Sequence, residues 1–196
     1  MRFTEEEYNE IYSLTFDTPG YAGYRPEVQE APNGDGKWDE QKKYAHIATK
    51  YNPGTELKRF YARGYEEAHS VCLKLGFPSH LYPSWDNSCM RILDYPPGAE
   101  SAEHTDFDLF TIQLYRDQPE GFVRTGTVDQ ADESISTGIH FGEMAEVAGL
   151  RKAMPHRVKA LNVRQRSIVF FVIPQPTATL VTVGDWLAER YARSRR

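Results

Sequence analysis

Two stretches of the sequence decide the expected fold: residues 89–117, CMRILDYPPGAESAEHTDFDLFTIQLYRD, and residues 142–174, GEMAEVAGLRKAMPHRVKALNVRQRSIVFFVIP. Both contain β-branched and aromatic runs that proline, glycine and short polar segments interrupt, which is typical of strands joined by turns. The run from Val169 to Val172 is apolar at every position, so we expect a central strand that is covered on both faces. This half of the chain is therefore predicted to be mainly β.

The expected strands are separated by turns and polar loops, and they are Ser88–Tyr95, Phe107–Tyr115, Gly121–Thr125, Thr137–Phe141, His156–Leu161 and Arg166–Ile173.

The front half of the chain is predicted to be helical and rich in loops. Thr4 followed by Glu7 is a capping-box pattern, so a short helix should begin there. Apolar residues at three-four spacing predict a longer helix from about Thr55 to Leu75, which Gly76 should end. Between these helices, residues 16–53 contain several Pro and Gly pairs, so we expect a long irregular loop of the kind that often forms a lid.

At 196 residues the chain fits one domain, residues 1–196. We expect a front segment of helices and loops (1–83), a β core (84–174), and a C-terminal segment (175–196) with a helix from about 184 to 193. The expected fold class is mainly β, with the N-terminal helices packed against the β core.

Composition limits the partners and the compartment. A net charge of −5 gives no electrostatic reason to expect nucleic acid. The longest apolar run, Ile168 to Pro174, is too short for a membrane span, and the acidic start MRFTEEEYNE does not resemble a targeting signal. Two cysteines, Cys72 and Cys89, indicate a reducing compartment, so we expect a cytoplasmic protein. Nothing in the composition specifies an oligomeric state.

A candidate metal site lies in the β half. His104 and Asp106 are separated by one residue, and His156 follows fifty residues after the aspartate. Residues i and i+2 of a strand point the same way, so this His and Asp can share one ion, and a histidine from a distant strand can complete a triangle. Two imidazoles and one carboxylate on one face of a metal leave the other positions open, as in non-haem iron(II) oxygenases.

The surroundings of these residues resemble a known family. The order R-I-x-x-Y-P, H-T-D-F-x-x-x-T, G-E-M and H-R-V, followed by a serine on an F-F strand, is similar to the 2-oxoglutarate- and iron(II)-dependent dioxygenases, specifically the branch of isopenicillin N synthase and the plant-type enzymes. The likeness covers about the second half of the chain. It implies a double-stranded β-helix, or jelly roll, with Fe(II) inside one mouth, and it implies O2 and 2-oxoglutarate as cosubstrates for the oxidation of a small-molecule substrate.

The resemblance also implies roles for single residues. His104, Asp106 and His156 match the iron ligands, and no catalytic residue beyond them is implied. Tyr95 and Ser167 match the residues that hydrogen-bond the far carboxylate of 2-oxoglutarate. The family's arginine, two residues before this serine, is replaced here by Gln165.

Other residues are candidates for the missing cation. Arg166 and Arg164 flank Gln165, but regular alternation turns them to the other face unless a bulge re-aims one of them. Arg91 shares the strand face of Tyr95, and Gln113 adds a polar group to the same cavity.

Three readings of function therefore stay open. The leading hypothesis is a 2-oxoglutarate-dependent dioxygenase that hydroxylates, desaturates or cyclises its substrate. The alternatives are an iron oxidase of the isopenicillin N synthase type that needs no 2-oxoglutarate, and a non-catalytic jelly-roll metal-binding protein. His140, close to the G-E-M turn, is predicted to be a structural histidine rather than a ligand.

Overall fold

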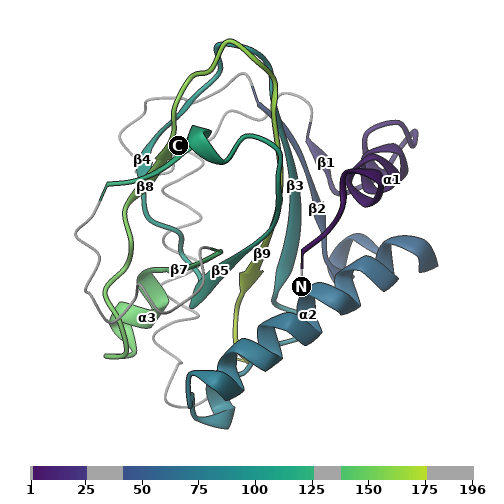
Figure 1. Cartoon of the computed structure of the whole chain (residues 1–196). Helices are drawn as coiled ribbons and strands as arrows, with labels where there is room; N and C mark the ends of the chain where they lie inside the picture. Colours follow the sequence, from purple (N-terminus) through teal and green to yellow (C-terminus); the bar gives the residue numbers. More distant parts are fainter. Residues whose placement is uncertain (1, 26–41, 126–137, 176–196) are drawn as a thin grey trace.

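The computed structural model describes residues 2–25, 42–125 and 138–175. Within these ranges the strands form two antiparallel sheets (Figure 1). The main sheet has the order β1 (Tyr24–Arg25), β2 (Lys43–Ile47), β3 (Cys89–Tyr95), β9 (Gln165–Val172), β5 (Phe110–Arg116) and β7 (Ile139–Phe141). The smaller sheet has the order β4 (Ser101–His104), β8 (His156–Val158) and β6 (Phe122–Arg124).

Strands that are distant in the sequence lie side by side. β9 pairs with both β3 and β5, and β8 pairs with both β4 and β6. The chain therefore crosses repeatedly between the two sheets, as expected for a double-stranded β-helix.

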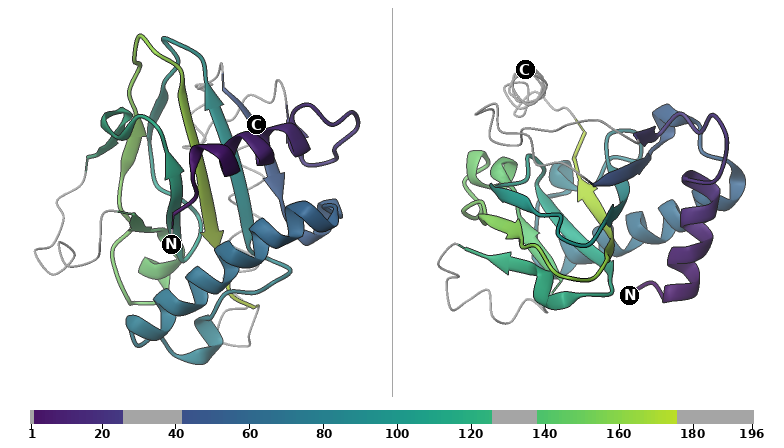
Figure 2. Two further views of the ribbon diagram at one scale, coloured as in Figure 1. Left: turned by 45° about the vertical axis from the view of Figure 1, so that its right-hand side comes forward. Right: turned by 90° about the horizontal axis from the view of Figure 1, so that it is seen from above.

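Two helices, α1 (Glu5–Thr15) and α2 (Thr55–Lys74), lie on the same side of the main sheet, and the smaller sheet lies on the opposite side (Figures 1 and 2). A short helix, α3 (Glu143–Val147), follows β7, and three short 3-10 turns cover Thr49–Tyr51 (η1), Ser79–Leu81 (η2) and Pro119–Gly121 (η3).

The largest apolar cluster fills the space between these helices and the main sheet. At Gly64 the axis of α2 comes so close to β9 that a Cβ atom there would lie 2.6 Å from the ring of Phe170. A second, smaller cluster lies between the sheets and includes Tyr44, Leu93 and Val158.

Both helices of the front half confirm the predictions. Thr4 caps α1: its hydroxyl accepts from the backbone N–H of Glu7, and the Glu7 carboxylate accepts from the backbone N–H of Thr4. Gly76, which follows α2 and its C-cap residue, has a φ of +66°, a conformation that glycine adopts without steric cost.

The expected strands are present where they are described, with shifted ends, and one strand of the β half, β4, was missed. β4 is short and has a mostly polar sequence, SAEH, so it carries no alternating apolar pattern. Residues of the expected C-terminal helix, and Thr137, lie outside the described residues.

The expectation of an irregular loop over residues 16–53 is wrong where the structure describes it, because β1 and β2 lie there. β2 pairs with β3, and its residues are covered on both faces: Ala45 and Ile47 pack toward the helices, while Tyr44 packs between the sheets. Burial on both faces removes the polar-apolar alternation that identifies a strand. The main sheet therefore begins upstream of the expected β core at residue 84. Among the residues described, no helix has both the length and the apolar character needed to cross a bilayer.

Candidate metal centre

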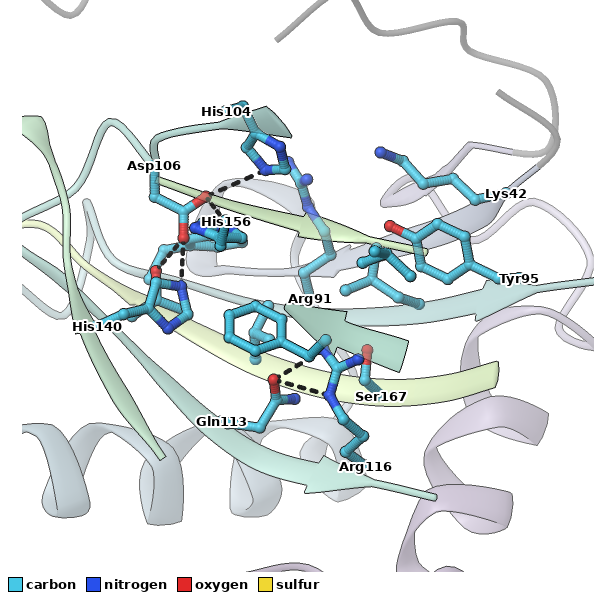
Figure 3. Close-up of a pocket in the computed structure, with 16 residues that line it drawn as sticks. Lys42, Arg91, Tyr95, His104, Asp106, Gln113, Arg116, His140, His156 and Ser167 are labelled. Carbon is cyan, nitrogen blue, oxygen red and sulfur yellow. Dashed lines mark hydrogen bonds and ion pairs between the residues drawn. The ribbon is translucent and has the colours of Figure 1, made fainter. Parts of the chain in front are cut away.

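The candidate ligands meet because two strands pair. His104 ends β4 and His156 begins β8, and these residues are direct partners across the antiparallel pair. Their ring centroids lie 4.4 Å apart. Asp106, two residues beyond the end of β4, turns its carboxylate toward both rings (Figure 3). The structure therefore brings together all three predicted ligands.

Two of the three ligand-atom separations fit a single ion. Oδ1 of Asp106 lies 3.8 Å from Nε2 of His104 and 3.9 Å from Nε2 of His156, and one ligand atom from each residue lies within 4.8 Å of the others. Two ligand atoms at about 2.1 Å from one ion lie at most about 4.2 Å apart. The two distances to the carboxylate are within that limit.

Backbone carbonyls orient both imidazoles. Nδ1 of His104 lies 2.8 Å from the carbonyl oxygen of Ala102, and Nδ1 of His156 lies 3.1 Å from that of Met154. A carbonyl oxygen only accepts, so each Nδ1 carries the hydrogen and each Nε2 presents a lone pair beside Asp106. Ligand histidines in metalloproteins are commonly held by such a bond.

The second oxygen of Asp106 is held from the other direction. Oδ2 accepts a hydrogen bond from the Thr111 hydroxyl at 2.6 Å, and Nε2 of His140 lies 2.8 Å from it. His140 is buried on β7, which pairs with β5 opposite Thr111. It is a hydrogen-bonded structural histidine, as predicted, but its partner is a candidate metal ligand.

Electrostatics favour the protonation states that a metal requires. Burial lowers the pKa of His156 to about 4 and also lowers the pKa of His104, so both rings are neutral near neutral pH. Burial alone would raise the pKa of Asp106, but the charge effect of His156 and the hydrogen bond to His140 outweigh it and hold this pKa well below its usual range. Two neutral imidazoles and one carboxylate are the result.

A second buried carboxyl group supports the Asp106 loop. Oδ2 of Asp108 accepts from the backbone N–H of Val172 and lies 2.8 Å from the Thr111 hydroxyl oxygen. Burial and the neighbouring Asp106 raise the pKa of Asp108 well above its usual range. Gly142 lies against it, and a Cβ atom there would lie 2.3 Å from both the backbone oxygen and Oδ1 of Asp108.

The candidate ligands open into a cavity of about 60 Å³ between the two sheets. Tyr95, Ser167, Arg91 and Gln113, all predicted as cosubstrate residues, line it. The guanidinium of Arg91 lies over the rings of Tyr44 and Phe171 and donates to His46, so Arg91 contributes to the wall through stacking as well as charge.

Two other predicted cosubstrate residues do not line the cavity. Arg166 lies on the opposite face of β9, where it binds Asp117 and Glu5 against α1. Regular alternation along β9 places it there, because no bulge re-aims it. Gln165 is buried, but its amide donates to the carbonyl oxygen of Lys159 and packs against Gly121. Arg164 is also turned away, since its guanidinium binds Asp94 at 2.6 and 2.5 Å.

The sequence argument missed two cations that line the cavity, Lys42 and Arg116. The expected strand ended at Tyr115, and alternation from Thr111 through Gln113 would have placed Tyr115, not Arg116, in the cavity. For Arg116, the only available signal was an arginine next to a strand that carries two cavity residues. That signal does not show that the side chains of β5 change from one face of the sheet to the other before Arg116.

The comparisons with known proteins find the fold but no sequence family. No family model and no curated protein sequence matches the chain. Among solved structures, a rice dioxygenase for auxin oxidation superimposes with a TM-score of 0.56 and 15% identity over 98% of this chain and 82% of that chain. A full-length Neurospora crassa protein in complex with alpha-KG and 5-formyluracil superimposes with a TM-score of 0.54 and 14% identity, over 91% of this chain and 73% of that chain. JOX2, in complex with 2OG, Fe and JA, superimposes with a TM-score of 0.57 and 16% identity, over 87% of this chain and 63% of that chain.

These similarities confirm the expected fold. At such low identity they establish the double-stranded β-helix and its likeness to the 2-oxoglutarate- and iron(II)-dependent dioxygenases at the level of architecture. None of these three singles out the isopenicillin N synthase branch.

Proposed function

We propose that this chain is a non-haem Fe(II)- and 2-oxoglutarate-dependent dioxygenase that uses O2 to oxidise a small-molecule substrate. The observation that carries the proposal is the meeting of His104, Asp106 and His156 at one cavity inside a jelly roll. Two neutral imidazoles and one carboxylate are the protein ligands of such oxygenases, and they leave the remaining coordination positions for ligands from solution.

The residues of this chain have separable tasks. Iron(II) with 2-oxoglutarate and O2 would supply the oxidising power for a hydroxylation, a desaturation or a ring closure. The protein holds the metal through its three ligands, and His140 and Thr111 keep Asp106 turned toward the histidines. Apolar side chains on the cavity wall exclude water and position the substrate, and these are Leu93, Phe122, Val158, Val169 and Phe171.

Two polar groups support a dicarboxylate cosubstrate. Tyr95 and Ser167 line the same cavity as the candidate ligands, on the wall that β3 and β9 form together. Their hydroxyl groups are suitable donors to a carboxylate. The similar Neurospora crassa structure contains alpha-KG, which is 2-oxoglutarate, and JOX2 contains 2OG and Fe.

A small-molecule substrate is supported by the similar Neurospora crassa protein, whose structure contains 5-formyluracil. The motifs around the ligands support a place in the isopenicillin N synthase branch. The free cysteines Cys72 and Cys89 agree with a reducing, cytoplasmic setting.

The test is an anaerobic titration of the purified protein with iron(II) and then with 2-oxoglutarate. We expect one iron per chain, followed by the visible charge-transfer absorption of the iron–2-oxoglutarate chelate. Admission of O2 with a small-molecule library should then release succinate. Failure to bind iron(II) would overturn the proposal.

One observation favours a second candidate, an iron oxidase that takes all its electrons from the substrate. Gln165 is neutral and turned away where the resemblance calls for an arginine, so β9 supplies no cation to a cosubstrate. Consumption of O2 without release of succinate would select this candidate. If the third reading, a non-catalytic metal-binding protein, is correct, His104→Ala and His156→Ala lower stability while the parent protein shows no turnover at all.

A further inference from the structure

The cavity contains a half-buried cation that the metal does not use. Arg116 lines the cavity, and its Nε and Nη2 atoms both donate to Oε1 of Gln113, at 3.2 and 2.9 Å. Its guanidinium carbon lies 4.9 Å from the centre of the Phe122 ring. Within residues 2–25, 42–125 and 138–175 no carboxylate lies within ion-pair distance of Arg116, because the adjacent Asp117 binds Arg166 instead.

Even partial burial without a counterion is unfavourable for this guanidinium. Burial lowers the pKa of Arg116 to about 10, so the group is still charged at neutral pH. A buried charge is normally neutralised by a partner, and a guanidinium carries five N–H donors that suit a carboxylate. The neutral Oε1 of Gln113 accepts hydrogen bonds from two nitrogen atoms of this guanidinium. The arrangement therefore favours an anionic ligand in the cavity.

A β-bulge turns Arg116 into the cavity. In the pairing of β5 with β9, Gln113 is opposite Val169, but Tyr115 is already opposite Ile168, so Leu114 is an extra residue. The amide of Gln113 stabilises this irregularity by donating to the carbonyl oxygens of Tyr115 and Ile168.

The extra residue changes the face on which later residues lie. Leu114 and Tyr115 both turn toward the helices, Leu114 near Gly64 of α2 and Tyr115 against Tyr8 of α1 at 5.0 Å between ring centres. Arg116 consequently returns to the cavity face, directly opposite Ser167 on β9.

The position of Arg116 compensates for the loss at Gln165. Gln165, at the position where the resemblance implies an arginine, is neutral, and its amide donates to the carbonyl oxygen of Lys159. Arg116 comes from the neighbouring strand to the same wall, and Figure 3 shows its guanidinium beside Ser167. Tyr95 lines the same cavity. The cavity thus keeps one arginine near the serine, on a different strand.

We propose that Arg116 of β5, and not a residue of β9, binds the distal carboxylate of 2-oxoglutarate. The inference rests on the proposed function. It makes Arg116 the residue that selects 2-oxo acids with a second carboxylate over 2-oxo acids without one.

Two probes isolate this carboxylate: 2-oxoglutarate, and 2-oxopentanoate, which has the same carbon chain with a methyl group in its place. Their dissociation constants are measured anaerobically by calorimetry on the iron(II)-loaded wild type, Arg116→Met and Arg116→Lys. The matched control is Arg59→Met, because Arg59 is an exposed arginine on α2 away from the cavity.

In the wild type and in Arg59→Met, 2-oxoglutarate should bind more tightly than 2-oxopentanoate. Arg116→Met should weaken 2-oxoglutarate binding by about 30-fold or more, because one partner of a buried charge pair is lost, while iron(II) loading and 2-oxopentanoate binding stay close to those of the wild type. Arg116→Lys should keep part of the preference, since lysine retains the charge but not the planar pair of donors.

Full 2-oxoglutarate affinity in an iron-loaded Arg116→Met protein would overturn the role of Arg116 and leave the proposed function intact. A wild type that loads iron(II) but does not distinguish the two acids would overturn both the role and the use of 2-oxoglutarate. If Arg116→Met does not fold, the preference in Arg116→Lys decides, because an unchanged preference would contradict the inference.

Discussion

Nε2 of His140 lies 2.8 Å from Oδ2 of Asp106, whereas Oδ1 of the same carboxylate lies 3.8 Å from Nε2 of His104 and 3.9 Å from Nε2 of His156. The two oxygens of Asp106 therefore have different roles. One is available to a metal, and the other is fixed by a residue 34 positions further along the chain.

His140→Ala should weaken iron(II) binding by about 10- to 100-fold, because partners that orient a metal ligand typically contribute that much to affinity. Thr111 alone would then hold Oδ2 of Asp106. The measurement is an anaerobic iron(II) titration, with His80→Ala as the control because His80 is exposed. Equal affinities in the two variants would show that His140 has no positioning role.

Metal binding should stabilise the folded chain. At a free metal concentration of 100 times the dissociation constant, the free energy of unfolding should rise by about 2.7 kcal/mol. For a chain of this size that corresponds to a rise in melting temperature of roughly 5–11 °C. Manganese(II) can replace iron(II) in thermal melts to avoid oxidation. His156→Ala should lose this shift, and a chelator should reverse it in the wild type; a shift that persists in the variant would place the metal elsewhere.

Gly142→Ala should disturb the candidate metal centre through the backbone. The added Cβ would lie 2.3 Å from the backbone oxygen of Asp108 and 2.8 Å from that of Asp106, so the loop that carries the ligand has to move. We expect a loss of roughly 1–3 kcal/mol in the free energy of unfolding, together with weaker iron(II) binding. Gly54→Ala is the control, because nothing lies within 4 Å of a Cβ there. Chemical denaturation and metal titration check both effects, and a variant as stable as the control would contradict the close packing of this loop.

The buried thiol of Cys72 and the half-buried thiol of Cys89 should make the fold sensitive to alkaline pH. Burial raises the pKa of Cys72 to about 12 and that of Cys89 to about 11, from an ordinary value near 9. Above pH 9 the unfolded chain releases these protons while the folded chain keeps them, so stability present below pH 9 is lost as the pH rises toward 11–12.

Cys72→Ala isolates one of these groups. The variant should be less stable than the wild type at pH 7, because it leaves a small cavity, and the difference should shrink between about pH 9 and pH 11. Urea unfolding at several pH values measures this difference. A difference that stays constant over this range would show that the thiol of Cys72 does not titrate differently on folding.

Local chemistry in the sequence was sufficient for the main features of the site. The spacing of His104, Asp106 and His156 and the motifs around them predicted the candidate metal centre and the jelly roll. The helix that begins at Thr55 was predicted from its apolar spacing, which is a local property. The helix and the pair of His104 and Asp106 are predictable because each depends on residues a few positions apart, or on a pattern with one period. The jelly roll and the role of His156 as the third ligand were predicted through the family resemblance.

Only the tertiary structure decided which side chains complete the cavity. One extra residue at Leu114 reverses the faces of β5, so Arg116 enters the cavity, and no local pattern in the sequence marks that bulge. Likewise, His140 contacts Asp106 because β7 pairs with β5. β2 belongs to the main sheet because it pairs with β3. Such pairings join distant parts of the chain, and their register depends on the packing of both faces at once. Without the extra residue in β5, Arg116 would lie on the helix side of the main sheet. With it, Arg116 lies on the cavity side, together with the candidate metal ligands.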